Sequence, residues 1–179
     1  MEKGNEYLNN LYEWSGYNKM ELIYRGTRDG SSSNIFHNKC DNQGPTICLF
    51  KNEKGNIFGG YTSVSWASPD KGQYKSANDN FIFTLTNIYE TIPTKYPLTN
   101  YFEKAVYHDK GLGPVFGYGH DLKIANNFLN DYSTSYMEYS YKDVLGKVNS
   151  VFSGDEKDII KDSICKFKLK ELEAFKLIK

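Results

Sequence analysis

The stretch ELIYRGTRDGSSSNIFHNKCDNQGPTICLFKNEKGNIFGGYTSVSW, residues 21–66, decides the fold of this chain. Its first residues alternate between apolar and polar side chains, as the two faces of a strand do. The serines at 31–33 then offer N-cap oxygens for a short helix over 34–40, with Phe36 and Cys40 on its inward face. This half of the stretch predicts a strand followed by a small capped helix.

The second half of the stretch predicts a β-hairpin. Residues 46–51 and 57–66 have the composition of strands, and the loop between them contains Gly55. Gly59 and Gly60 lie inside the second arm, where glycine indicates a bulge or the close approach of another backbone. Trp66, at the end of this arm, is a candidate for the core.

The rest of the chain predicts more short strands than helices. Of 179 residues, 15 are tyrosine, 11 phenylalanine and 2 tryptophan, and aromatic side chains favour the half-buried surface of a sheet. The remaining predicted elements are a helix over 5–15, strands over 81–86, 105–108, 122–124 and 165–177, and an exposed or edge strand over 132–140. The pattern predicts mainly β structure with short helices (α+β), arranged as a two-layer antiparallel β-sandwich flanked by small helices.

Composition and charge argue against several classes of protein. The 22 basic and 22 acidic residues give no net charge, whereas binding to nucleic acid or to an anionic membrane needs an excess of Lys and Arg. No apolar run approaches the ~20 residues of a membrane helix, and the N-terminus lacks the apolar region of a secretory signal. Cys40, Cys48 and Cys165 have neither disulfide-framework nor zinc-site spacing. We expect a cytoplasmic protein with free thiols and no cofactor or metal.

Two glutamates near the C-terminus disturb the last predicted strand. If the alternation over 165–177 is continuous, Glu171 and Glu173 lie on the apolar face, where an unpaired charge is costly. A bulge would turn one or both outward. Alternatively, Glu173 is buried and held by backbone N–H groups or by a basic partner such as Arg25 or Arg28. A functional carboxylate is the third interpretation, because perturbed acids gather at sites.

Two His–Asp doublets, His108–Asp109 and His120–Asp121, raise the question of a metal or catalytic site. Adjacent residues of a strand point to opposite faces, so neither doublet can chelate an ion by itself. We expect a turn aspartate beside a surface histidine in each doublet, and an exposed His37 on the short helix. His120 and Asp121 stay among the candidate site residues, with a structural or a functional role.

Several blocks of the chain, in their order and spacing, resemble the TLDc domain family, typified by the eukaryotic oxidation-resistance proteins. The blocks are LIYRGTRDG, FHNKCDNQGPTICLF, IFGGYTSVSW, FIFTLT, GPVFGYGHDLKIANNF and FKLKELEAF. We take residues 20–179 as the domain and 1–19 as an N-terminal helical segment packed on it, with Trp14 placed to fasten that helix. Members of the family fold as a sandwich of two antiparallel sheets flanked by short helices, which agrees with the element pattern.

The resemblance implies a function exerted through protein contacts. No catalytic mechanism is established for the family, and the implied roles are protection from oxidative stress and binding to the vacuolar proton-pumping ATPase. In the block GLGPVFGYG, Pro114 and Val115 interrupt a run that usually has more consecutive glycines. We therefore expect a non-enzymatic interaction domain. The alternatives are an enzyme with an unrecognised site around Glu173 and a generic scaffold of a larger complex.

Overall fold

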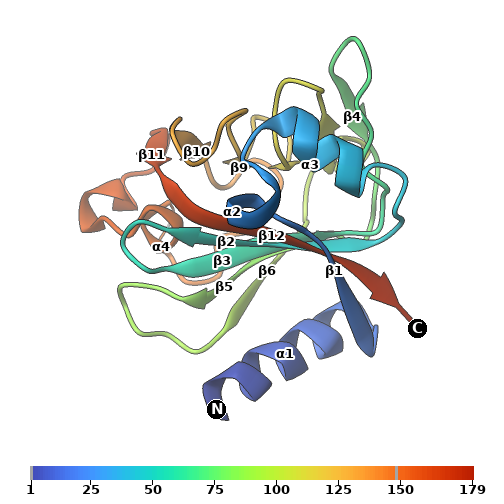
Figure 1. Ribbon diagram of the computed structural model, residues 1–179. Helices are drawn as coiled ribbons and strands as arrows, with labels where there is room; N and C mark the ends of the chain where they lie inside the picture. Colours follow the sequence, from blue (N-terminus) through green and yellow to red (C-terminus); the bar gives the residue numbers. More distant parts are fainter. Residues whose placement is uncertain (1, 148) are drawn as a thin grey trace.

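The computed structural model describes residues 2–147 and 149–179, which form two antiparallel sheets with short helices around them (Figure 1). The first sheet has the strand order β1-β12-β2-β3-β5-β6, and the second has the order β11-β10-β9-β8-β7-β4. The strands of the first sheet are β1 (Lys19–Arg25), β2 (Thr46–Asn52), β3 (Ile57–Thr62), β5 (Phe81–Thr86), β6 (Thr94–Pro97) and β12 (Leu169–Ile178). Those of the second are β4 (Gln73–Lys75), β7 (Val106–His108), β8 (Val115–Phe116), β9 (Leu122–Lys123), β10 (Ser133–Ser135) and β11 (Cys165–Phe167). The predicted antiparallel sandwich with small helices is confirmed.

The helical segments connect strands or cover a sheet. They are α1 (Glu2–Ser15), α2 (Gly26–Asp29), α3 (Ser33–Cys40), the 3-10 helix η1 (Phe102–Lys104), α4 (Ser150–Ser153) and the 3-10 helix η2 (Glu156–Ile159). α3 begins at the predicted serine run, where Ser32 Oγ accepts a hydrogen bond from the Ile35 N–H at 3.4 Å. α1 ends before Gly16, whose φ of +73° reverses the chain. Among the described residues, no helix has the length and apolar character that crossing a membrane requires.

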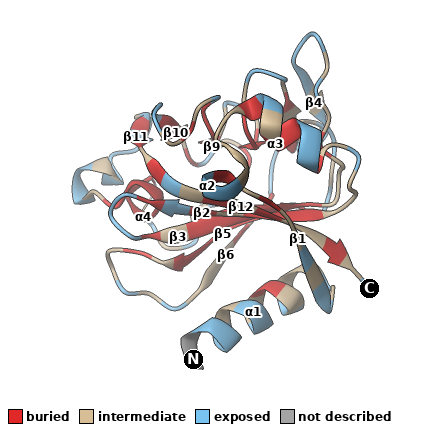
Figure 2. Ribbon diagram, in the orientation of Figure 1, coloured by how far each residue is buried: buried red, intermediate tan, exposed pale blue. Residues whose placement is uncertain are grey.

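The main core lies between the two sheets and is rich in aromatic rings. Trp66 is buried, and its ring centroid lies 5.9 Å from that of Phe36 and 5.6 Å from that of Phe116. Its indole N–H donates to Thr46 Oγ1 at 2.9 Å, so the one polar atom of this ring is satisfied. Figure 2 shows that buried residues concentrate along the first sheet, which has a covering layer on each side.

The outer face of the first sheet is covered by α1, which lies on the side away from α2 and α3 (Figure 1). Leu11 of α1 is buried there together with Leu177 of β12. The ring of Trp14 lies 6.2 Å from Phe81 and 6.1 Å from Phe83, both on β5. The predicted contact between Trp14 and the sandwich is therefore present.

The C-terminal stretch 165–177 forms two strands, so the prediction of a single strand is wrong. β11 pairs with β10 in the second sheet, whereas β12 pairs with β1 and β2 in the first. The chain changes sheets at Lys168, whose carbonyl accepts the Glu53 N–H at 3.0 Å, and such corners let one chain join two layers. The pairing of β12 with β2 has a register shift between Leu169 and Glu171. This is the β-bulge that the positions of Glu171 and Glu173 in the sequence indicated.

The prediction of an exposed polar segment near the C-terminal third of the chain is also wrong. The stretch 132–140 was expected at an exposed position or an edge, but β10 lies between β9 and β11, and Ser133 and Ser135 are buried. Their hydroxyls are satisfied inside, because Ser133 Oγ accepts the Ala125 N–H at 3.1 Å and Ser135 Oγ donates to Asn149 Oδ1 at 2.8 Å. Small hydroxyl side chains with internal partners can therefore line an interior strand.

Two of the three predicted surface histidines, His37 and His108, are buried as well, and His120 is partly buried. His37 is 4 % exposed, its Nδ1 lies 2.7 Å from Asp41 Oδ1, and its Nε2 lies 3.0 Å from each of the Asp109 and Leu112 carbonyl oxygens. His108 is 1 % exposed because the alternation of β7 places it on the inward face. These two rings join the core instead of the surface.

Candidate functional site

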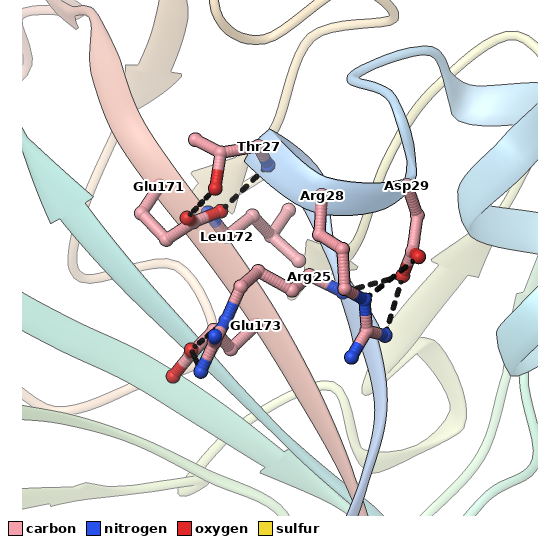
Figure 3. Close-up of polar contacts among 7 residues, drawn as sticks. All are labelled: Arg25, Thr27, Arg28, Asp29, Glu171, Leu172 and Glu173. Carbon is pink, nitrogen blue, oxygen red and sulfur yellow. Dashed lines mark hydrogen bonds and ion pairs between the residues drawn. The ribbon is translucent and has the colours of Figure 1, made fainter.

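The end of β1, helix α2 and the middle of β12 meet at one edge of the first sheet. We call this place the α2 corner, and it consists of Arg25, Thr27, Arg28, Asp29, Glu171 and Glu173 (Figure 3). Gly26 allows α2 to lie close, because a Cβ at this position would come within 2.2 Å of the Phe128 ring. α2 ends at Gly30, which has a φ of +115° and whose carbonyl accepts the Tyr24 hydroxyl at 2.6 Å. The two glycines thus place the charged residues of α2 directly beside β12.

Arg25 and Glu173 form an ion pair across the two neighbouring strands. They are opposite in the register of β1 and β12, and Nε and Nη2 of the guanidinium both lie 2.6 Å from Glu173 Oε1. The two side chains are 43 % and 22 % exposed, and exposed pairs of this kind contribute about 0.2–1 kcal/mol. The pair therefore fixes the position of two surface charges more than it stabilises the sheet.

Glu171 is held by helix α2. Its Oε1 accepts the backbone N–H of Thr27 at 3.1 Å and that of Leu172 at 3.0 Å, and its Oε2 accepts the Thr27 hydroxyl. Leu172, between the two glutamates, is fully buried, so the bulge has moved the apolar phase of β12 onto the even-numbered residues. The interpretation in which a bulge turns the glutamates outward is confirmed, and the predicted Arg25 partner of Glu173 is present too.

Arg28 forms a separate pair with Asp29. Its Nε and Nη2 donate to the two carboxylate oxygens at 2.9 and 2.8 Å, in the two-pronged geometry that suits a guanidinium. Asp29 Oδ2 also accepts the Arg25 N–H at 3.0 Å. The hydrogen bond from Arg28, followed by that backbone N–H, holds the pKa of Asp29 well below its usual value. The corner thus displays two fixed and oriented ion pairs.

A groove of about 270 Å³ lies beside this corner. It is lined by Leu49, Phe50, Lys51, Ile57, Glu171 and Glu173. Leu49 and Ile57 are partly buried and lie on the face of the first sheet that α1 covers further along. An apolar hollow with two carboxylates at its border suits a partner that brings an apolar side chain and a basic group.

The two glycines of β3 have a packing role. A Cβ at Gly59 would lie 2.0 Å from the Cys48 carbonyl oxygen, and one at Gly60 would lie 2.5 Å from the Phe116 ring. β2 and β3 pair in continuous register past both positions, so the close-approach alternative holds and the bulge alternative does not. Gly59 and Gly60 are buried in β3, and Trp66 belongs to the main core.

His120 and Asp121 lie in the turn between β8 and β9 of the second sheet and not in this corner. Asp121 is fully buried and its carboxylate accepts the N–H groups of Tyr139, Ser140 and Tyr141 at 3.1–3.3 Å. Burial raises the pKa of Asp121 to about 7, against the opposite effect of those N–H groups. Asp121 is the expected turn aspartate, between β8 and β9, but its carboxylate is buried because it accepts the N–H groups of a later loop. Burial lowers the pKa of His120, and its ring lies 5.2 Å from that of Tyr107.

The sequence of this chain matches a known family along almost its whole length. The TLDc domain family matches residues 2–178. The chain belongs to the TLDc domain family. The matched region contains α1 and the strands of both sheets, so the α2 corner is part of the TLDc domain.

The comparison with curated proteins gives a relative from zebrafish (Danio rerio), named MTOR-associated protein MEAK7. It is 33 % identical to this chain over 64 residues, which are 36 % of this chain and 14 % of that protein. The match thus covers a small part of the relative's length and concerns a segment of the TLDc domain.

Sequence reasoning found the acids of the corner and one of their partners. It named Arg25 for Glu173 but missed Thr27, although a hydroxyl directly after the turn residue Gly26 is a recognisable signal. Among the described residues, no three His, Cys, Asp or Glu side chains converge so that they could hold a metal ion. What the corner offers chemically is therefore ionic and hydrogen-bonding contact beside an apolar groove.

Proposed function

We propose that this TLDc domain is a non-enzymatic docking module that acts in the cytoplasm on a protein partner. Following the family resemblance, we propose the vacuolar proton-pumping ATPase as that partner and protection from oxidative stress as the outcome. The observation that carries the docking proposal is the α2 corner, where the exposed Arg25–Glu173 pair borders the groove of Leu49 and Ile57. Preorganised charges beside an apolar hollow are a common form of interface anchor.

The cysteines support a protective role that is exerted through a partner. Cys40, Cys48 and Cys165 are buried as free thiols. Burial raises the pKa of Cys165 to about 12 and raises those of Cys40 and Cys48 further above the usual value. Peroxide reacts with the thiolate, so thiols in this state react slowly. A module that does not itself consume oxidant can still protect a cell by regulating a pump.

The test is recovery of pump subunits from cytosol on the immobilised protein at about 50 mM salt, where electrostatic attraction extends beyond 10 Å. We expect the unmodified protein to recover subunits of the cytosolic sector. Glu173→Lys, which leaves an exposed Arg25 beside a new cation, should reduce recovery about tenfold. Glu13→Lys is the matched control, because it makes the same charge change on the exposed surface of α1 and should leave recovery unchanged.

Two outcomes would count against the proposal in different ways. Failure of the unmodified protein to recover pump subunits at low salt would exclude the pump as the partner. Recovery of unrelated proteins with the same sensitivity to Glu173→Lys would keep the docking module and replace the pump by a larger complex in which this chain is a scaffold.

A further inference from the structure

A second surface, built from other segments than the α2 corner, is covered by tyrosine rings. The tyrosine face consists of Tyr74, Tyr101, Tyr107, Tyr118, Tyr136 and Tyr139, which come from separate parts of the chain. Neighbouring rings have centroids 4.8–6.1 Å apart along the whole series. The members are partly buried or exposed, and Tyr101 is 44 % exposed. Tyrosine is enriched at the centres of protein interfaces, because it offers a large contact area with little loss of conformational entropy.

A hollow of about 460 Å³ opens within this face. It is lined by Asn100, Tyr101, Glu138 and Tyr139, so it combines two aromatic rings, one amide and one carboxylate. Ring faces carry partial negative charge and a carboxylate carries a full one. This lining is complementary to a cation and would repel a phosphate or a carboxylate.

The chain's own ammonium groups already occupy the neighbourhood. Lys104 Nζ lies 3.8 Å from the ring centroid of Tyr118, a ring beside the hollow whose centroid lies 4.9 Å from that of Tyr101 and 6.1 Å from that of Tyr139. Lys161 Nζ lies 3.1 Å from Glu138 Oε2, and its side chain is 67 % exposed. The carboxylate that lines the hollow, and a ring of the tyrosine face next to the hollow, therefore each attract a cation within this protein, and the exposed Lys161 side chain can be displaced from Glu138.

The walls of the hollow are held in place before any partner arrives. Tyr101 and Glu138 have left-handed backbones, with φ of +52° and +81°, a state that is rare and costs about 1–3 kcal/mol for residues other than glycine. The N–H of Tyr139 donates to the buried carboxylate of Asp121 at 3.1 Å, which fixes the loop that carries both Glu138 and Tyr139. A rigid site of this kind loses little entropy on binding.

We propose that this hollow binds an arginine side chain of a protein partner, and that this arginine displaces Lys161 from Glu138. Arginine fits better than lysine, because a planar guanidinium stacks on aromatic faces and at the same time presents a two-pronged donor to a carboxylate. The proposal does not depend on the identity of the partner or on the α2 corner.

The probe is acetyl-arginine amide, titrated to about 50 mM because a single side chain is expected to bind at about millimolar affinity. Binding is followed through the NMR signals of the tyrosine rings. We expect shifts in the signals of Tyr101 and Tyr139, and none with acetyl-citrulline amide, which has the same shape without the charge. Absence of shifts with the arginine probe, or equal shifts with citrulline, would overturn the proposal.

Two variants with opposite expected effects separate cation binding from simple aromatic contact. Glu138→Gln should weaken binding of the arginine probe about fivefold, and Lys161→Gln should strengthen it about threefold, because the competing ammonium is removed. Glu13→Gln on α1 is the matched loss of one carboxylate and should change nothing. The proposal is wrong if Lys161→Gln weakens binding, or if acetyl-glutamate amide or inorganic phosphate shifts the same rings, because the site would then favour anions.

Discussion

Strands of the first sheet are four to ten residues long, whereas those of the second sheet have two or three. Long strands bring many apolar side chains into contact, and the first sheet accordingly packs on both of its faces. The second sheet has few ladder hydrogen bonds of its own. It is fixed instead by buried polar side chains that reach across loops.

Asp121 and Asn149 are the main fixed points of the second sheet. Asp121 accepts N–H groups from the loop after β10. Asn149 Oδ1 accepts the Ser135 hydroxyl at 2.8 Å and the Met137 N–H at 2.9 Å, and its Nδ2 donates to the Ser163 carbonyl at 2.7 Å. The comparison teaches that the first sheet depends mainly on apolar contact along its long strands, while the second, which shares the main core, depends in addition on single polar residues. Substitutions should therefore have very different effects in the two sheets.

The largest effect is expected at Asp121. Asp121→Ala leaves three backbone N–H groups without their acceptor in a buried place, and we expect a loss of about 3 kcal/mol in the free energy of unfolding. Urea unfolding measures the loss. Asp131→Ala is the matched control, because Asp131 is exposed, and it should cost under about 0.5 kcal/mol. Equal stability of the two variants would mean that the hydrogen bonds to Asp121 do not stabilise the second sheet.

The cost of Asp121→Ala should also depend on pH. Burial raises the pKa of Asp121 to about 7, so the folded protein retains a proton that the unfolded chain releases near pH 4. The stabilisation that this proton provides is complete below the unfolded pKa and is lost as pH rises through about 7. The stability difference between the unmodified protein and the variant should be larger at about pH 5 than at about pH 8. A difference that grows with pH would contradict the assignment.

The next largest effect is expected in the first sheet, at its apolar contact with α1. We propose that the N-terminal helical segment is fastened to the domain through Trp14, whose ring contacts Phe81 and Phe83. Trp14→Ala should cost about 2 kcal/mol and lower the melting temperature by about 5 °C for a chain of this size. Glu13→Ala on the exposed side of the same helix should leave the melting temperature unchanged. An unchanged melting temperature for Trp14→Ala would refute the fastening role.

A smaller effect, of opposite sign, is expected at His108 in the second sheet. Neither ring nitrogen has a hydrogen-bond partner among the residues that the structure describes, and the ring packs 5.5 Å from that of Trp66. His108→Phe keeps an aromatic ring there and removes two unpaired polar atoms, so we expect a gain of about 1 kcal/mol at pH 7. A loss at pH 7 would imply a polar partner for the ring.

The same variant should change the response to acid. Burial, followed by the charge of Lys75, lowers the pKa of His108 from 6.5 to about 4. The unfolded chain therefore takes up a proton first, and the stability that His108 contributes is lost as pH falls from about 6.5 through about 4. Relative to the unmodified protein, His108→Phe should gain stability as the pH is lowered through that window. Parallel pH profiles for the two proteins would exclude titration of His108 as the cause.

How much the sequence predicts follows the same division between the sheets. The strand 81–86 and the hairpin of β2 and β3 were predictable, because runs of six or seven residues with the composition of buried strands are bounded by turn residues such as Gly55. β8 and β9 each have two residues, which is too short for any period, and their positions depend on contacts far along the chain. A short sequence window therefore predicts the long strands and misses strands whose positions are set by residues far along the chain.

The candidate sites show the same limit. Glu171 and Glu173 were found because they break the period of a strand, and a broken period is visible in one segment. The buried states of His37 and Asp121 could not be predicted, since the backbone groups that enclose them belong to loops 18 to 75 residues away. The tyrosine face was missed for the same reason, because no short window contains its members.

The smallest effect is expected for the Arg25–Glu173 pair. It tests most directly whether the first sheet needs a polar contact for its stability. A double-mutant cycle with Arg25→Met and Glu173→Gln should give a coupling of about 0.5 kcal/mol in urea unfolding, because both side chains are partly in water. The coupling should fall further at about 1 M salt. A sheet held by apolar contact does not need this pair for its stability, so the charges are available for docking. A coupling above about 2 kcal/mol would instead make the α2 corner a polar fixed point of the first sheet, equivalent to Asp121 in the second.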